Sequence, residues 1–361
     1  MPNKNLNRRQ FVTAASVSSL AVMAANVIPA FGKSDSVDPL SRDQKRTWLD
    51  INKITYGARP DKSGPIGGGK GYDRIITRGD YTVDNLEALL DALSQVKAGQ
   101  VIFIPSNAEI DMTTRIYIEK IALNIPAGVT LASDRGHDGS KGGMITSDSL
   151  DTPAMIKIMG PGVRITGLRL QGPNPKRYLD HHKRAFGKGG EGHKYYYKFP
   201  LAKGIITTFP KLEVDNCEIY AFSSAGISLQ QGTGHHIHHN FIHKCQYNGL
   251  GYGVSHDVAS SVIEFNIFNE NRHSIAGTGR PGCGYVARNN VHEEISLSHC
   301  FDMHGGRDRK DGTQIAGTTI EIYNNTFYPP ERAVVIRGVP QEKCDVHHNW
   351  FVKHQNVKES V

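Results

Sequence analysis

Residues 237–242 read Ile-His-His-Asn-Phe-Ile, and residues 263–268 read Ile-Glu-Phe-Asn-Ile-Phe. In both, an aliphatic residue is followed three positions later by a turn residue and five positions later by another apolar residue. The pattern occurs six times, at residues 214–219, 237–242, 263–268, 286–291, 322–327 and 346–351. Its turn positions, 217, 240, 266, 289, 325 and 349, are separated by 23, 26, 23, 36 and 24 residues. Such a period predicts a solenoid of stacked β-coils.

The turn position is asparagine in every repeat but the first, where it is Cys217. Asparagine tolerates a left-handed backbone conformation, and its side chain can hydrogen-bond to equivalent residues above and below in a stack. We therefore expect one asparagine per coil to form the turn and to link neighbouring coils.

The N-terminal half of the chain is predicted to extend the same stack. Leucines recur at helical spacing from Leu86 to Leu93; Asp84 with Glu87 resembles a capping box, and Gly99 is a plausible end. Short apolar segments bounded by glycine or proline then follow at residues 101–105, 123–131, 155–158 and 163–170. Strands of this length with such turns are typical of further coils.

These features resemble the right-handed parallel β-helix proteins of the pectate-lyase-like superfamily, over roughly residues 55–355. The resemblance is carried by the glycine-rich start, the helix, the Ile-Pro-Ala-Gly-Val-Thr-Leu stretch at 125–131 and the asparagine repeat. It implies an all-β fold, a right-handed parallel β-helix with an N-terminal capping helix, forming one domain at 51–361. The WIDH motif of pectate lyases and the NTD, DD, GHG and RIK motifs of polygalacturonases do not occur in the sequence. The resemblance therefore predicts the fold more strongly than the reaction.

The N-terminal residues indicate export. Residues 7–12 read Asn-Arg-Arg-Gln-Phe-Val and precede a run rich in Ala, Ser and Val, a pattern that resembles a twin-arginine signal peptide. We predict a cleaved signal at 1–32, a linker at 33–50, and a periplasmic or secreted protein without stable membrane insertion. Five cysteines, an odd number with no CxxC pair, are interpreted mainly as apolar fillers of the coils.

The formal charge of +7 indicates an anionic partner. Two predicted insertions interrupt the period, at 172–203 and 305–317. The first is basic with interleaved aromatic residues, including Lys194 and Tyr196, and is predicted to form a wall beside a cleft. Because the chain also carries an export signal and lacks a nucleic-acid-binding motif, we expect a monomer that binds an acidic polysaccharide or oligosaccharide and no nucleic acid.

Two columns of polar residues are predicted on one side of the stack, where equivalent positions of neighbouring coils lie about 4.8 Å apart. Aligning the glycines that end the strands gives one column of Tyr252, Thr278, His304 and Arg337. Five positions upstream lies a second column of Tyr247, His273, His299 and Arg332. Strand alternation directs Asp302 and His304 outward. Other histidines are interpreted as stacked turn residues: His235, His236, His238, His239, His347 and His348.

The outward residues suit β-elimination on a uronic-acid polymer. That reaction needs a group that neutralises the carboxylate, a base for the C5 proton and an acid for the leaving oxygen. Arg337 or His304 would neutralise, His273 or His304 would be the base, and Tyr252 would be the acid. The predicted substrate-binding residues are Asp302, Arg272, Tyr247, His299, Arg280, Lys194 and Tyr196.

Three alternatives remain open on the same scaffold. A glycoside hydrolase needs two carboxylates about 5–10 Å apart, which Asp302 would form with Glu264 or Asp257. A uronate epimerase would use residues similar to those of a lyase, and a non-catalytic β-helix would bind glycan without turnover. No cofactor is assigned; calcium is a candidate ion near Asp302 or Glu264, although the spacing matches no calcium-binding loop.

Overall fold

The computed structural model describes residues 46–361, apart from 174–175 and 248. The predicted signal peptide and most of the predicted linker lie outside the described residues. The end of that linker is a strand, because β1 (Trp48–Ile51) forms an antiparallel hairpin with β2 (Ile54–Gly57). None of the helices in the described part of the chain combines the length and apolar character that a membrane span requires.

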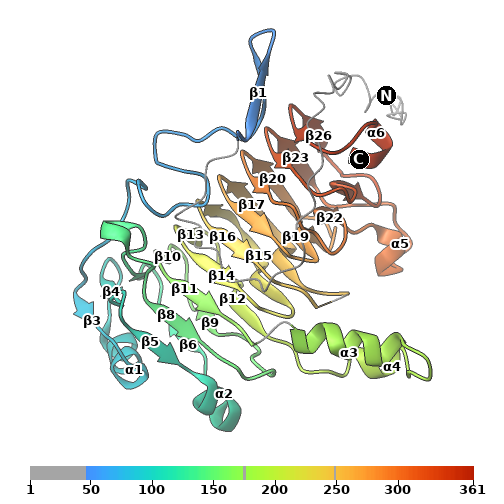
Figure 1. Ribbon diagram of the computed structural model, residues 1–361. Coiled ribbons are helices and arrows are strands. Elements are labelled where there is room, and N and C mark those ends of the chain that lie inside the picture. The colour runs from blue at the N-terminus through green and yellow to red at the C-terminus, as the bar shows by residue number, and fades with distance from the viewer. Residues whose placement is uncertain (1–45, 174–175, 248) are drawn as a thin grey trace, which may run out of the picture.

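The protein is a right-handed parallel β-helix in which successive strands of each coil lie on three sheets (Figure 1). Sheet 1 contains β6 (Leu123–Ile125), β9 (Ile156–Ile158), β12 (Lys203–Thr207), the first part of β15 (Ala225–His238), the first part of β17 (Tyr252–Glu264), β19 (His273–Gly277), β22 (Phe301–Met303) and β25 (Val334–Ile336).

Sheet 2 is continuous with sheet 1 because β15 and β17 run through both. It contains β3 (Tyr81–Thr82), β4 (Val101–Phe103), β7 (Thr130–Ala132), β10 (Arg164–Thr166), β13 (Glu213–Asp215), the second parts of β15 and β17, β20 (Gly284–Arg288), β23 (Thr319–Tyr323) and β26 (Lys343–His347).

Sheet 3 closes the coils. It contains β5 (Glu109–Asp111), β8 (Met144–Thr146), β11 (Arg169–Gln171), β14 (Glu218–Tyr220), β16 (Phe241–His243), β18 (Ile267–Asn269), β21 (Val291–His292), β24 (Thr326–Phe327) and β27 (Trp350–Phe351). The predicted all-β parallel β-helix is confirmed.

Helix α1 (Leu86–Gln95) lies at the N-terminal end of the stack, as predicted for a capping helix (Figure 1). It packs on β4 and β6 and buries Leu89. Its N-cap is Asn85, whose side chain accepts a hydrogen bond from the Ala88 amide, so the expected start at Asp84 is one residue early. The other helices of the described residues are α2 (Thr113–Glu119), the 3-10 helix η3 (His137–Gly139), α3 (Lys176–Phe186), α4 (His193–Tyr196), α5 (Gly306–Arg309) and α6 (Val357–Ser360).

The first aliphatic residue of every repeat but the fourth faces the interior and stacks on its equivalents along the axis; in the fourth repeat Ala287 takes this place, and Val286 points outward. Ile237, for example, pairs with Val214 on one side and Ile263 on the other, and all three are fully buried. Burying an aliphatic side chain of this size contributes about 1.5–3 kcal/mol. The period-2 alternation within each short strand therefore fixes which residues face outward.

A ladder of asparagine side chains joins the coils, as predicted. In one repeat, however, the ladder asparagine is not the residue that the sequence pattern indicated. Each ladder Oδ1 accepts the backbone amide of the equivalent residue one coil earlier, at 2.9–3.0 Å. The ladder residues are Asn240, Asn266, Asn290, Asn325 and Asn349. In the fourth repeat the ladder residue is thus Asn290 rather than Asn289.

The two functions expected of one asparagine are divided between neighbours. The residue before each ladder asparagine has a left-handed backbone, and it need not be asparagine: His239, Phe265 and His348 have φ of 53°, 53° and 52°. Asn289 is the left-handed residue of its turn, with φ of 52°. Hydrogen bonds from the ladder side chains to both adjacent coils hold these turns.

Replacing Asn266 by alanine tests the ladder. The substitution leaves the buried Asn240 amide without its acceptor and removes the bond from Asn266 Nδ2 to the Ile237 carbonyl. Each buried polar group left unsatisfied costs about 1–3 kcal/mol, so we expect the free energy of unfolding in urea to fall by about 2–4 kcal/mol. The exposed Asn124→Ala control in β6 should change it by less than about 0.5 kcal/mol. Equal effects of the two substitutions would contradict the ladder's role.

Candidate functional site

Asp302 is the centre of the predicted polar patch. It lies on β22 between Phe301 and Met303, and although it points away from the apolar interior its side chain is fully buried. Three side chains cover it. His299 Nε2 lies 3.1 Å from Oδ1 and His304 Nε2 lies 3.1 Å from Oδ2. Arg337 donates to both oxygens, with its Nε 2.9 Å from Oδ1 and its Nη2 3.0 Å from Oδ2.

The register of two coils brings His304 and Arg337 together. Met303 of β22 pairs with Ile336 of β25, so the residues that follow, His304 and Arg337, are also opposite one another. Each side chain is about one-third exposed, and each also lies 3.7 Å from the carboxylate of Asp308 in α5. Asp308 was not singled out from the sequence, because its position depends on how the 305–317 insertion folds back.

The Asp302 carboxylate is ionised in this environment. Burial alone would raise its pKa, but hydrogen bonds from His299 and His304 and the nearby positive charge lower the pKa well below its ordinary value. Because a carboxylate only accepts hydrogen bonds, the Nε2 atom of His304 carries a proton, and in the neutral ring Nδ1 then holds the lone pair. Asp302 thereby fixes both the orientation and the tautomer of His304.

His273 lies beneath the surface of this patch. Its side chain has no exposed area, and its ring lies 4.0 Å from that of His299. Its Nδ1 lies 2.6 Å from the His299 carbonyl and so donates to it, whereas its Nε2 has no hydrogen-bond partner. Burial, together with the charge of Arg272, lowers the pKa of His273 to about 3. His273 is therefore a neutral, internal residue, whereas the side chain of His304 is 32% exposed.

One residue was assigned to the wrong column of polar residues. Tyr252 pairs with His273 in the strand register, and their rings stack with centroids 5.9 Å apart, so Tyr252 belongs to the column of His273 and His299. Its predicted place beside Thr278 is taken by Asp257, because His256 pairs with Gly277. The error arose from treating Gly253 as the end of a strand, whereas β17 continues to Glu264. Burial raises the pKa of Tyr252.

The predicted wall at 172–203 contains α3 and α4, which project from the stack on the same side as α5 (Figure 1). Tyr196 and Tyr247, both predicted to bind substrate, are buried within its base. Their rings stack at 4.5 Å, and the Tyr247 hydroxyl donates to the Tyr196 carbonyl. These two residues hold the insertion on the coils and are not accessible to a polymer. Lys194 is exposed, as a substrate-binding residue requires.

Tyr197, one of the interleaved aromatic residues of the insertion, reaches the patch, although it was not among the predicted substrate-binding residues. Its hydroxyl packs so closely on Gly249 that a Cβ at that glycine would lie 2.3 Å away. The Gly249 carbonyl in turn accepts the hydroxyl of Tyr252. Tyr197 is half-exposed and borders the column of Tyr252 and His273.

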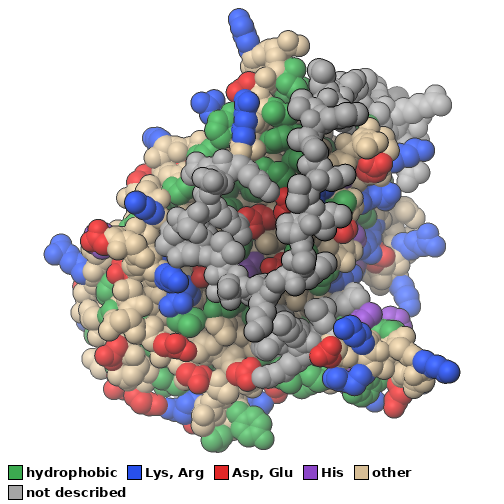
Figure 2. Space-filling model, in the orientation of Figure 1, with side chains coloured by type: hydrophobic (Ala, Val, Ile, Leu, Met, Phe, Trp, Pro, Cys, Tyr) green, Lys and Arg blue, Asp and Glu red, His purple; other side chains and the backbone are tan. Residues whose placement is uncertain are grey.

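The two remaining arginines differ in their surroundings. Arg280 is exposed and donates to both oxygens of Asp257 at 3.0 Å, next to the outward column. Arg272 is half-buried, and its Nη1 atom is buried without a hydrogen-bond partner. Lys and Arg side chains also project along the edge of the molecule that carries α4 and α5 (Figure 2). The patch is thus bordered by positive charge, which suits an anionic ligand.

The two acidic residues considered as hydrolase partners of Asp302 are both held by other side chains. Glu264 lies in the part of β17 that belongs to sheet 2 and is bound by His236 and Arg288. Burial alone would raise its pKa, but these hydrogen bonds lower the pKa to about 2. The alternative partner, Asp257, is held by Thr278 and Arg280.

Two groups of potential metal ligands occur among the described residues: His273 with His299 and Asp302, and Glu213 with His236 and His238. Neither matches the set of six to eight oxygen ligands that calcium takes. The oxygens of Asp302 are engaged by Arg337 and two histidines, and those of Glu264 by His236 and Arg288. The donor sets near both residues therefore do not favour calcium.

No family model matches the chain, and no curated protein matches it in sequence. Three solved structures are similar. A family 28 exopolygalacturonase from Yersinia enterocolitica has 12% sequence identity and a TM-score of 0.44, with 73% of this chain and 59% of that chain covered. An alginate lyase from a Paenibacillus species has 13% identity and a TM-score of 0.33, with 75% and 98% covered. The Dettilon tailspike protein has 12% identity and a TM-score of 0.35, with 76% and 63% covered. The chain thus spans less than two thirds of the exopolygalacturonase and of the tailspike protein.

Asp302→Asn tests the electrostatics of the patch. The folded-state pKa of Asp302 lies below its unfolded value, so its ion pairs stabilise the protein above about pH 4 and are lost as pH falls through the folded pKa. We expect the variant to lose about 2–3 kcal/mol of unfolding free energy at pH 7, since Arg337 keeps some contact with water. Urea unfolding from pH 7 to pH 3 should show this difference shrinking below about pH 4. A difference independent of pH would contradict the ionised state.

Proposed function

We propose that the protein is an exported enzyme that cleaves an acidic, uronic-acid-containing polysaccharide by β-elimination. The observation that carries the proposal is that one buried carboxylate, Asp302, orients His304 and Arg337 side by side on an exposed face. One is a base with a fixed tautomer and the other is a permanent cation. The basic border of the patch and the projecting insertion suit a long anionic chain.

His304 is the proposed base. Its Nε2–H donates to Asp302, so the lone pair of Nδ1 is available to take the C5 proton of a uronic acid. Asp308, 3.7 Å from Nδ1, would stabilise the imidazolium formed by that transfer. The pairing with Asp302 also keeps the ring from turning, which preserves its alignment.

Arg337 is the proposed group that neutralises the uronate. Its charge lowers the energy of the enolate-like species formed when C5 loses its proton. Tyr252 is the proposed acid for the leaving oxygen, because its phenol carries a proton at neutral pH and its ring is held in place by stacking on His273. Breaking the bond from C4 to this oxygen then leaves a double bond between C4 and C5.

A retaining or inverting hydrolase requires a carboxylic acid that protonates the leaving oxygen. Asp302 does not supply it, since its depressed pKa keeps it ionised and Arg337 occupies both of its oxygens. The site chemistry thus favours a lyase over a hydrolase. An epimerase shares the proton-abstraction step and is distinguished by its product.

Alanine substitutions at His304 and Arg337 test the assignment. Each should lower kcat/KM by about 100-fold or more, because a positioned base contributes about 10²–10⁴-fold and electrostatic groups contribute similarly. Turnover is measured on alginate, pectate, glucuronan and glycosaminoglycans by the ultraviolet absorbance of the unsaturated product. His137→Ala is the matched control, since His137 also pairs with an aspartate but lies in η3, outside the patch.

Full activity in both variants would refute these roles. New reducing ends without new absorbance would identify a hydrolase, and deuterium uptake at C5 without chain cleavage would identify an epimerase. Salt-dependent binding of the polymers without any turnover would identify a glycan-binding protein.

A further inference from the structure

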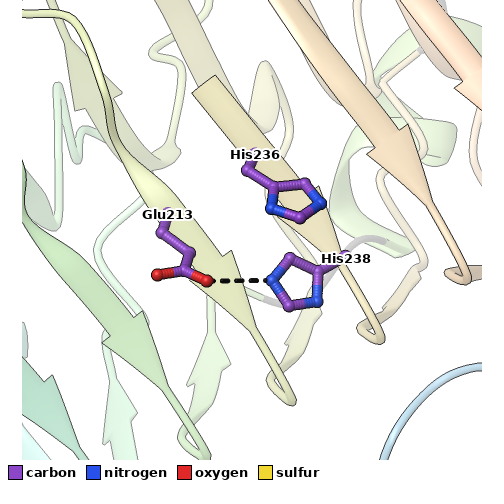
Figure 3. Close-up of side chains that lie close together, drawn as sticks. All are labelled: Glu213, His236 and His238. Atoms are coloured by element: carbon purple, nitrogen blue, oxygen red, sulfur yellow. Dashed lines mark hydrogen bonds and ion pairs between the residues drawn. The ribbon is translucent and has the colours of Figure 1, made fainter. Parts of the chain in front are cut away.

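A second cluster of histidine and carboxylate side chains lies on the outer face of sheet 2, away from Asp302. Glu213 of β13 is paired in register with His236 of β15, and His238 is two residues further along the same strand (Figure 3). Residues two apart on a strand point to the same face, so the three side chains converge. One ligand atom from each lies within 4.8 Å of the other two.

The contacts within this cluster bring together the atoms that would bind an ion. His238 Nε2 lies 3.1 Å from Glu213 Oε1, and the rings of His236 and His238 are 4.0 Å apart. His236 Nε2 also lies 2.8 Å from Oε1 of Glu264, a second carboxylate on the neighbouring strand. His238 is buried, whereas the side chain of His236 is 40% exposed and gives access from solvent.

We propose that Glu213, His236 and His238 form a binding site for one divalent transition-metal ion such as Zn²⁺, with Glu264 as an additional carboxylate ligand. Two imidazoles and one or two carboxylates match the ligand set of zinc and its neighbours Co²⁺, Ni²⁺ and Cu²⁺. Calcium and magnesium prefer oxygen ligands alone and fit the cluster poorly.

The hydrogen bonds behind the cluster supply a second, independent reason. When His238 is neutral, its Nε2 must donate to the Glu213 carboxylate, so its Nδ1 can only accept. That Nδ1 lies 2.9 Å from Nδ1 of His239, which must then donate. The Nε2 of His239 is thereby left with a bare lone pair, 3.4 Å from the Asp61 carboxylate. This buried atom has no hydrogen-bond partner.

A metal ion on His238 Nε2 removes this conflict. The proton of His238 moves to Nδ1 and donates to His239 Nδ1, and the proton of His239 moves to Nε2, where it can donate to Asp61. A hydrogen bond from the other ring nitrogen of a metal-bound histidine, which fixes its tautomer, is usual in metal sites. The turn histidines His238 and His239 therefore have a role beyond stacking.

Two arginines hold the carboxylates of the cluster, and the ion must displace them. Arg288 Nε lies 2.6 Å from Glu264 Oε2, and the Arg288 side chain is 39% exposed. Arg74 Nη1 lies 2.5 Å from Glu213 Oε1; Arg74 belongs to an irregular segment, and its side chain is 42% exposed. Arg337, by contrast, follows directly after strand β25 and holds both oxygens of Asp302. The Glu213 cluster can thus accept a cation more readily than the cluster around Asp302.

The test is titration of the full chain, without affinity tag and after EDTA treatment, with Co²⁺ followed by visible absorbance and with Zn²⁺ by calorimetry. We expect one ion per chain and a melting temperature that rises with metal concentration. His236→Ala should weaken binding by more than about 100-fold, since loss of an outer-shell partner alone costs roughly 10–100-fold. Arg74→Ala should tighten it.

His347→Ala is the matched control. His347 lies on the same face of sheet 2 in another His-His-Asn turn, with its Nδ1 2.5 Å from that of His348, but it belongs to neither ligand group among the described residues. Its substitution should leave the affinity unchanged. Absence of saturable binding, or binding unchanged in His236→Ala, would overturn the proposal. So would binding that is lost in His299→Ala, since the ion would then belong to the Asp302 patch.

Discussion

The stacking of one coil on the next in fixed register is the constraint on which the rest of the molecule depends. Backbone pairing sets the spacing, and the asparagine ladder prevents a coil from sliding by one residue, since that would leave buried amides such as that of Asn266 without an acceptor. A one-residue slip would also turn the interior aliphatic residues outward. His304 and Arg337 lie side by side because this register is enforced along the whole stack.

Within that register, the cost of burying Asp302 determines how the patch is arranged. An isolated buried carboxylate would be strongly unfavourable, so Arg337 and two histidines gather around it. Their side chains are thereby held in single orientations on an otherwise exposed surface. The same interactions that compensate the buried charge thus pre-align a base and a cation, which is what catalysis of proton abstraction requires.

The sequence predicted the architecture because the apolar residues of the repeat are the residues that pack in the interior, where they alternate with outward-facing residues along each strand. It also predicted that His304 and Arg337 are neighbours, since only one strand end had to be located. The sequence-based prediction was wrong where the local pattern was misleading or incomplete. Asn289 fits the apolar template better than Asn290, because Val286 and Val291 stand at the template positions around it, yet Asn290 is the ladder residue. The corner inside β17 contains no glycine or proline to mark it. The burial of Tyr247 depends on how a distant insertion folds, which no local pattern encodes.

The Asp302 patch and the Glu213 cluster both surround a carboxylate with histidine and arginine side chains. They differ in which segments of the chain cover them, and this difference favours different ligands. On sheet 2, the segment of residues 61–74 folds over the cluster: the Tyr72 hydroxyl donates to Asp215 at 2.9 Å, and Arg74 contacts Glu213. This segment leaves Glu213 and His238 largely covered, while the side chain of His236 keeps 40% of its surface exposed. On sheet 1, the insertions at α3 and α5 stand beside the patch rather than over it, so His304 and Arg337 keep exposed surface. The proposed anionic polymer therefore fits the open Asp302 patch better than the partly covered Glu213 cluster.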